Sequence, residues 1–182
     1  MAGPLTTQEV GEILAAHPQY SSIRVFIESG TELGRTIKNM RSLFSVRHTI
    51  ELSPLFYVYA RFKLFGQGIR FRFGDSARIL PKIAARTTEP AVFFLDAHCS
   101  SGYTAGRDIP LYGELTAIAK RPYADLIIID DVRLFGTKKK PQEDWSGITR
   151  QKLEKVFSSH KLTASYVSND RLILVKEGRR GD

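Results

Sequence analysis

Acidic side chains stand at or directly after the ends of five short apolar segments of this 182-residue chain. They are Glu28, Glu51, Asp75, Asp96 and the adjacent pair Asp130–Asp131. Carboxylates gathered at one rim of a sheet repel one another and lose hydration, which costs free energy unless a ligand or a cation binds there. The recurrence of acids at these ends therefore predicts a polar binding site.

The first acid opens a turn that contains two glycines, Glu28-Ser-Gly30-Thr31-Glu-Leu-Gly34. Glycines spaced in this way let the backbone turn sharply and approach a ligand closely before a helix begins. The spacing differs from the G-x-G-x-x-G fingerprint, so a dinucleotide pyrophosphate is a poor fit. A purely structural turn is the alternative.

The next two acids suit the binding of a nucleoside. Glu51 follows the glycine turn by roughly 20 residues, a spacing at which an acid can accept the hydroxyl groups of a ribose. Asp75 follows Gly74 and precedes a predicted helix that begins at Ser76. Its side chain could reach an adenine amino group or cap the helix, and both roles are compatible if the Ser76 N–H contacts the adenine.

The remaining acids suit a metal ion. Asp96 and the pair Asp130–Asp131 end two successive buried segments, which would lie about 4.8 Å apart as neighbouring strands. Three carboxylates this close raise one another's pKa unless a cation lies among them. Ligands that are all oxygen favour Mg²⁺ or Ca²⁺. Without a metal, Asp130 or Asp131 would simply cap the loop that follows.

Residues near these acids could take part in catalysis or in substrate binding. His98 offers a neutral imidazole near pH 7 and could act as a general base. Cys99, the single cysteine, would point away from His98 on an extended chain, so a Cys–His nucleophile is disfavoured. Trp145 and Tyr103 lie on two long predicted loops, where they could stack on a substrate ring or anchor the loops.

Hydrophobic periodicity gives the elements that must position these residues. The predicted strands are 22–28, 48–52, 69–73, 91–95 and 124–129, and the predicted helices are 6–16, 35–44, 54–64, 76–85, 111–120 and 146–159. Ser146 is the expected cap of the last helix, and a hairpin that turns at Ser168–Asn169 closes the chain. This alternation predicts an α/β fold whose ligands bind at the carboxyl ends of the strands.

Length, apolar runs and charge limit the classes that remain. We expect one domain over residues 1–182, with 1–20 as an N-terminal helix and lead-in. Because apolar runs are short and MAGPLTTQEV lacks signal-peptide features, we expect a cytoplasmic protein without a membrane span. The net charge is +8. Because residues 35–90 carry most of the excess, including Arg70 and Arg72, a nucleic-acid-binding or RNA-modifying domain is the alternative, although no RNA-binding motif is recognisable.

The stretches VFIESGTELG, HTIELS, FRFGDS and AVFFLDAH occur in an order and spacing that resemble class I S-adenosylmethionine-dependent methyltransferases. The resemblance covers about residues 20–177. It implies a Rossmann-like, doubly wound, mostly parallel seven-stranded sheet that ends in an antiparallel hairpin. It also implies cofactor contacts from Glu28, Gly30, Thr31 and Gly34 to the methionine part, from Glu51 and Leu52 to the ribose, from Asp75 and Ser76 to the adenine, and from Asp96.

A narrower resemblance, in FFLDAH and LIIIDDVRLFG, is to the macrocin-type sugar O-methyltransferases, which depend on magnesium. It implies a Mg²⁺ site at Asp96, Asp130 and Asp131 and catalysis by Asp96 and His98, where that family has an aspartate in place of His98. The implied acceptor is a hydroxyl of a sugar, a glycan or another small polar molecule.

The resemblance leaves the quaternary structure and the activity with alternatives. The chain lacks the N-terminal extension and lid that such enzymes usually carry, so we expect a homodimer in which a neighbour covers the site. A relative that binds the cofactor without turnover is a further alternative.

Overall fold

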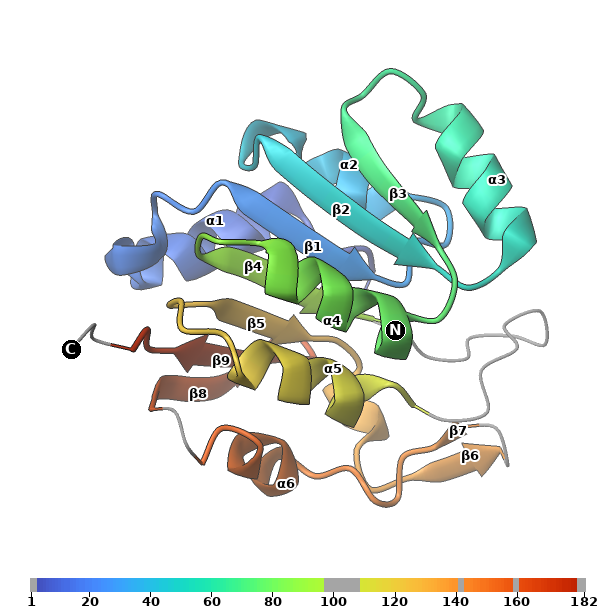
Figure 1. Cartoon of the computed structure of the whole chain (residues 1–182). Coiled ribbons are helices and arrows are strands. Elements are labelled where there is room, and N and C mark those ends of the chain that lie inside the picture. The colour runs from blue at the N-terminus through green and yellow to red at the C-terminus, as the bar shows by residue number, and fades with distance from the viewer. Residues whose placement is uncertain (1–2, 97–108, 141–142, 159–160, 180–182) are drawn as a thin grey trace.

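The computed structural model of the chain describes residues 3–96, 109–140, 143–158 and 161–179. Seven strands form one sheet in the order β3-β2-β1-β4-β5-β9-β8 (Figure 1). Strands β1 to β5 are parallel, and β9 runs antiparallel between β5 and β8. The strands are β1 Val25–Ser29, β2 Val46–Glu51, β3 Ile69–Phe73, β4 Ala91–Leu95, β5 Leu126–Ile129, β8 Leu162–Ser168 and β9 Arg171–Lys176. The predicted fold class is confirmed.

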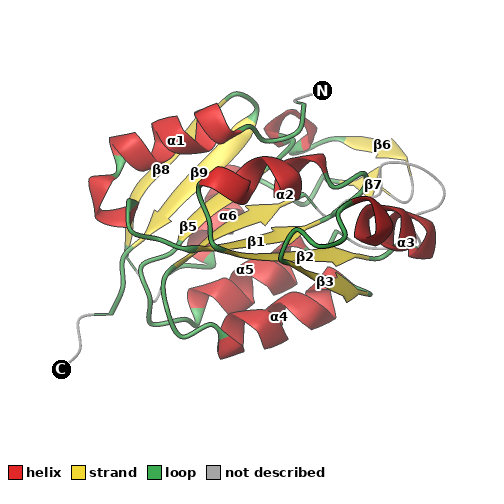
Figure 2. Cartoon of the chain, turned by 90° about the horizontal axis from the view of Figure 1, so that it is seen from above, coloured by secondary structure: helices red, strands yellow, loops and turns green. Residues whose placement is uncertain are grey.

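Helices cover both faces of this sheet. Figure 2 shows α1 and α2 on one face, α4 and α5 on the other, and α3 toward the end of the sheet formed by β3. The α-helices are α1 Thr7–Ala16, α2 Arg35–Asn39, α3 Pro54–Lys63, α4 Ser76–Arg86, α5 Leu111–Ala119 and α6 Arg150–Lys155. Short 3₁₀ turns η1 Pro18–Tyr20, η2 Met40–Ser42 and η3 Val132–Leu134 and a two-stranded piece, β6 Lys138–Lys140 with β7 Glu143–Asp144, complete the described elements.

The alternation of side chains along the strands divides the core into two layers. In β1, Val25 and Ile27 pack in the cluster that contains α4 and α5, whereas Phe26 packs in the cluster that contains α1 and α2. Successive side chains of a strand point to opposite faces. Glu28 therefore projects toward the α1–α2 face and Ser29 toward the α4–α5 face, which separates the surroundings of two adjacent polar residues.

Local capping explains where several helices begin. The capping box of Thr6 and Glu9 starts α1, as the sequence predicts. Pro54 occupies the first turn of α3, where its missing N–H costs no hydrogen bond.

Several predicted boundaries are wrong; the strands expected from 22 and from 124, for example, begin at Val25 and Leu126, and three further differences concern a cap, a turn and a helix end. The last helix is capped by Thr149 and not by Ser146, whose backbone and side chain bond to Asp144 of β7. The closing hairpin turns at Asn169–Asp170, where both residues have positive φ, a conformation that Asn and Asp tolerate. The helix expected over 35–44 leaves α-geometry after residue 39 and continues as the 3₁₀ turn η2.

Among the helices of the described segments, none combines the length and the apolar character that crossing a membrane requires.

Candidate functional site

The turn between β1 and α2 has a backbone shape that requires glycine. Gly30 and Gly34 have φ values of 86° and 70°, and Glu32 between them is also left-handed at 46°. A Cβ atom at Gly34 would lie 2.6 Å from Leu64 Cδ1, closer than real side chains allow. The Gly30 N–H donates to the Ile50 carbonyl at 3.0 Å, which holds the turn against the end of β2. The predicted close turn is therefore present.

Glu51 ends β2 and organises the backbone on both sides of it. Its side chain is buried, with 5% of its surface exposed. One carboxylate oxygen accepts the Glu32 N–H at 2.8 Å, and the other accepts the Ser53 N–H at 2.7 Å. Each oxygen has a second lone pair for a ligand hydroxyl. Leu52, which the resemblance places with Glu51 at the ribose, is partly exposed beside it.

Glu28 lies near the end of β1, beside the glycine turn, and hydrogen bonds connect it to two threonine hydroxyl groups. The Thr49 hydroxyl donates to Glu28 Oε2 at 2.6 Å, and the Thr31 and Thr49 hydroxyls are also 2.6 Å apart. Burial is the main reason that the pKa of Glu28 lies well above its ordinary value, and the negative charges of Asp96 and Glu51 raise it further. Glu28 is thus a buried acid that supports the turn through the hydroxyl groups of Thr49 and Thr31.

Asp75 caps α4, which confirms the structural role that the sequence left open. Its Oδ1 accepts the Ala77 N–H at 2.9 Å, and its other oxygen lies 3.8 Å from Arg78 Nε. Ser76 follows as the first residue of the helix and is buried. The Gly74 N–H donates to the Glu51 carbonyl at 2.8 Å, so the start of α4 is fixed to the same strand end as the glycine turn.

Glu114, on α5, is a buried acid that the sequence reasoning did not single out. Only 1% of its surface is exposed, and its Oε1 has no hydrogen-bond partner within the described residues. Burial raises the pKa of Glu114 to about 7, although the Ser76 and Ser29 hydroxyls favour its charged form. The signal was present in the sequence, because Glu114 interrupts the buried stripe of Leu111, Leu115 and Ile118.

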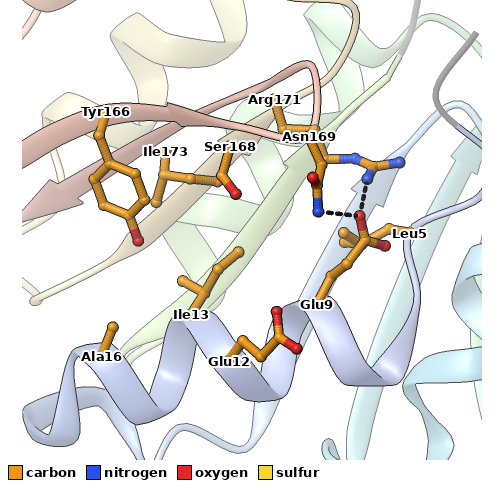
Figure 3. A pocket seen from close by; sticks show the side chains of 10 residues that line it. All are labelled: Leu5, Glu9, Glu12, Ile13, Ala16, Tyr166, Ser168, Asn169, Arg171 and Ile173. Atoms are coloured by element: carbon orange, nitrogen blue, oxygen red, sulfur yellow. Dashed lines mark hydrogen bonds and ion pairs between the residues drawn. The ribbon is translucent and has the colours of Figure 1, made fainter.

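The carboxyl edge of the sheet has a second half at the end of β5, where arginine side chains pair with the acidic residues. Arg171, the first residue of β9, is 3% exposed, and its Nε lies 3.2 Å from Asp130 Oδ1. The same guanidinium pairs with Glu9 of α1 at 2.5 Å, and Asn169 also contacts Glu9 (Figure 3). This network borders a cavity of about 190 Å³ between α1 and the β8–β9 hairpin. The carboxylate of Asp130 therefore pairs with a buried arginine inside the fold.

Asp131 has a comparable partner. It adopts a left-handed conformation with φ of 61°, and its carboxylate pairs with Arg133, which also pairs with Asp170. The pKa of Asp130 is raised to about 7 by burial first and then by the negative charges of Asp96 and Asp131, while Arg171 lowers it. The predicted crowding of carboxylates is present, and the cations that offset it in the described structure are arginines.

The fit of a magnesium ion to this half is poor. Two of the three expected ligands, Asp130 and Asp131, already pair with arginines. Within the described ranges, no three His, Cys, Asp or Glu side chains gather closely enough to hold a metal ion. The described residues therefore do not fit the Mg²⁺ site that the resemblance implied.

The remaining candidate residues divide between described and undescribed segments. Asp96 follows β4, and its N–H donates to the Ser29 carbonyl at 3.1 Å, which places it between the two halves of the edge. Trp145 is buried and stacks on Phe135 with ring centroids 5.9 Å apart, so it anchors its loop and is not open to a substrate ring. His98, Cys99 and Tyr103 lie outside the described residues.

Comparison with known proteins places this geometry in a known fold. No protein-family model and no curated protein matches the chain. Among solved structures, the O-methyltransferase TomG from Streptomyces achromogenes, involved in tomaymycin synthesis and solved with S-adenosylmethionine, aligns with a TM-score of 0.63 at 20% identity, covering 96% of this chain and 82% of TomG.

Two further structures align over similar lengths. An S-adenosylmethionine-dependent methyltransferase from Clostridium acetobutylicum gives a TM-score of 0.60 at 10% identity, covering 93% of this chain and 89% of that one. CalS10 from Micromonospora echinaspora, an amino pentose methyltransferase, gives 0.57 at 12% identity with the same coverage. Likeness at these identities shows the Rossmann-like methyltransferase fold, whereas the closeness to macrocin-type enzymes is not confirmed.

Proposed function

We propose that this chain is an S-adenosylmethionine-dependent methyltransferase that methylates a hydroxyl group of a sugar or of another small polar acceptor. The observation that carries the proposal is Glu51, a buried carboxylate held by two backbone N–H groups at the end of β2. It faces a glycine turn at the carboxyl edge of a sheet of the methyltransferase type. TomG and CalS10, both solved with S-adenosylmethionine, support the proposal by their fold.

The residues of the first half of the edge would bind the cofactor. The backbone of the turn from Gly30 to Gly34 would lie against its methionine part, and hydrogen bonds from Thr31 through Thr49 to Glu28 would hold the turn in place. The free lone pairs of Glu51 would accept ribose hydroxyls, beside Leu52. The Ser76 N–H, at the start of α4, would face the adenine, and Asp75 would keep that helix start in place.

The chemistry would take place where the two halves meet. When bound, S-adenosylmethionine supplies an electrophilic methyl group on a positively charged sulfur. Asp96, between Glu28 and Asp130, adds negative charge beside that position. His98, two residues further along the chain, would accept the proton of the acceptor hydroxyl as a general base. We assign no step to Mg²⁺, because Asp130 and Asp131 pair with arginines.

Calorimetric titration with S-adenosylhomocysteine tests the proposal. The wild-type chain should bind this product, and Glu51→Gln should weaken binding roughly tenfold to hundredfold, the scale of a hydrogen bond to a charged group. The matched control, Glu89→Gln, changes a partly exposed acid that pairs with Arg24 and should leave the affinity unchanged. Since the glutamine introduced by Glu51→Gln would turn an amide N–H₂ toward one backbone donor, circular dichroism must show that the variant folds.

The outcomes separate the remaining possibilities. Absence of binding by the wild-type chain would contradict the proposal. Binding without methyl transfer to any of a panel of sugars and phenols would instead indicate a relative that has lost turnover. If binding is observed, His98→Ala should keep the affinity and lower the rate by roughly 10²–10⁴-fold, as for the loss of a general base.

One observation keeps nucleic acid as a second candidate partner. Arg70 and Arg72 lie on β3 with exposed side chains, within the segment that carries most of the excess positive charge. Filter binding of RNA at two salt concentrations tests it, because phosphate contacts by arginine weaken steeply as salt is raised. The expected homodimer is tested independently by sedimentation velocity.

A further inference from the structure

Helix α3 exposes a continuous apolar stripe. Phe62 and Phe65 are 85% and 86% exposed, and Leu55 and Val58 are 66% and 64% exposed. Their spacing of three, four and three residues places them on one side of the helix and its C-terminal end. Together with Tyr59 and Phe73, they make up six of the eight exposed large hydrophobic residues in the described part of the chain. We call Leu55, Val58, Phe62 and Phe65 the α3 stripe.

The opposite side of the helix is fixed against the fold, so the stripe cannot turn inward. Ala60 and Leu64 are fully or almost fully buried, and Leu64 lies under Gly34. Tyr57 packs across β3, with its ring 5.3 Å from that of Phe73. Contiguous exposed apolar side chains on a folded domain usually mark an interaction surface. The stripe therefore indicates a binding partner outside the described fold.

The charged residues of α3 are all positive. Residues 54–73 contain no Asp or Glu, and α3 contributes Arg61 and Lys63. Arg70 and Arg72 alternate on β3 with Phe71 and Phe73, which contact Tyr57 of α3, so the two arginines project from the opposite face of the sheet. The Lys63 ammonium lies 5.2 Å from the Tyr59 ring, and the Arg61 guanidinium contacts the Tyr57 hydroxyl at 2.8 Å. No carboxylate of the described segments pairs with Arg61 or Lys63. Their charge is available to an anionic partner.

We propose that the α3 stripe, with Arg61 and Lys63 beside it, binds the surface of an anionic phospholipid membrane. Phe and Leu side chains would enter the boundary between head groups and acyl chains, while Arg61 and Lys63 would contact the phosphates. A second copy of the chain fits less well, since its own α3 stripe would bring the same two cations and no acid. A nucleic acid would use the cations but would leave the aliphatic Leu55 and Val58 in water.

Co-sedimentation with vesicles tests this assignment. The wild-type chain should bind vesicles of phosphatidylcholine mixed with phosphatidylglycerol about tenfold or more tightly than vesicles of phosphatidylcholine alone. Phe62→Glu combined with Phe65→Glu should weaken that binding by about tenfold or more, because each change removes an apolar ring and adds a repelled charge. The matched control is Val167→Glu on β8, another exposed apolar residue, which should bind as the wild type does.

Two double variants that lose the same amount of charge separate attraction by the α3 cations from attraction by the overall charge of the chain. Arg61→Gln with Lys63→Gln should weaken binding to the mixed vesicles. Lys120→Gln with Lys155→Gln changes exposed cations that follow α5 and lie on α6, and should weaken binding much less for the same loss of charge. All changed side chains are exposed or at the helix surface, and thermal denaturation should confirm that each variant folds.

Three results would overturn the proposal. One is that the wild-type chain does not bind the mixed vesicles, or that the double variant Phe62→Glu, Phe65→Glu binds them as tightly as the wild type. Another is a dimer in sedimentation velocity that this same variant dissociates, which would assign the stripe to a second copy. The third is salt-sensitive RNA retention by a chain that ignores vesicles, which would assign the cations to nucleic acid.

Discussion

The two halves of the sheet's carboxyl edge hold acids at matching strand ends but stabilise them differently. At β1 and β2, neutral donors hold Glu28 and Glu51, namely the Thr49 hydroxyl and two backbone N–H groups. At β5, arginines from other elements hold Asp130 and Asp131. Neutral donors leave the negative charge of Glu51 available to a ligand, whereas the arginines offset the charges of the two aspartates within the protein. Equivalent positions in a sheet thus need not share a role.

The largest effect should come from removing Arg171, the buried arginine of the β5 half. Arg171→Ala leaves Asp130 and Glu9 without their shared cation, and loss of one partner of a buried ion pair costs about 3–5 kcal/mol of unfolding free energy. Chemical denaturation measures this loss. Arg133→Ala is the matched control, since its side chain is 33% exposed and its removal should cost about 1 kcal/mol or less. Equal losses for both variants would erase the distinction between a buried and a peripheral arginine.

The next effect concerns Glu114 and depends on pH. Its pKa is about 7 in the folded chain against an ordinary value of 4.5, so the unfolded chain releases this proton first as pH rises. Stability should therefore fall between about pH 4.5 and 7, by about 3 kcal/mol for this group, and stay level above. Glu114→Gln removes that dependence, so its stability relative to wild type should rise across this window.

Denaturation midpoints of both chains across the pH range check this prediction. The control Glu12→Gln changes an exposed acid of α1 and should follow the wild-type curve. Because Asp130 also has a pKa raised to about 7, the difference between variant and wild type carries the result, and a flat difference would mean that Glu114 titrates normally.

The sequence predicted the residues that depend on local pattern and missed those that depend on long-range packing. The strand ends and the cap at Asp75 follow from periodicity and from neighbouring residue types, and both are confirmed. The pairing of Arg171 with Asp130 arises because β9 inserts beside β5, which no local pattern near either residue encodes. Glu114 meets Ser29 and Ser76 only once α5 packs on the sheet.

A smaller effect should separate the cap at Asp75 from its charge. Asp75→Ala removes the acceptor of the Ala77 N–H and should destabilise the chain by about 1 kcal/mol, whereas Asp75→Asn should cost little, because asparagine caps equally well. Thermal denaturation measures both. If S-adenosylhomocysteine binds, Asp75→Asn should keep its affinity as well. A large loss of affinity in the Asn variant would show that the carboxylate contacts the ligand directly.

The smallest expected effect is that of magnesium, and it decides how the β5 half of the edge should be understood. Stabilisation by a ligand is RT ln(1 + [L]/Kd), so a weak site shifts the unfolding free energy by less than about 0.4 kcal/mol while the ligand stays below its Kd. Because Asp130 and Asp131 pair with arginines, millimolar Mg²⁺ should produce only such a shift in thermal denaturation. Arg133→Met frees the carboxylate of Asp131 from one cation, so Mg²⁺ should stabilise this variant more than the wild type. A shift of several kcal/mol in the wild-type chain, abolished by Asp131→Asn, would show instead that a metal ion displaces the arginines from the two aspartates. Both halves of the edge would then bind a ligand, and they would differ only in which ligand they bind.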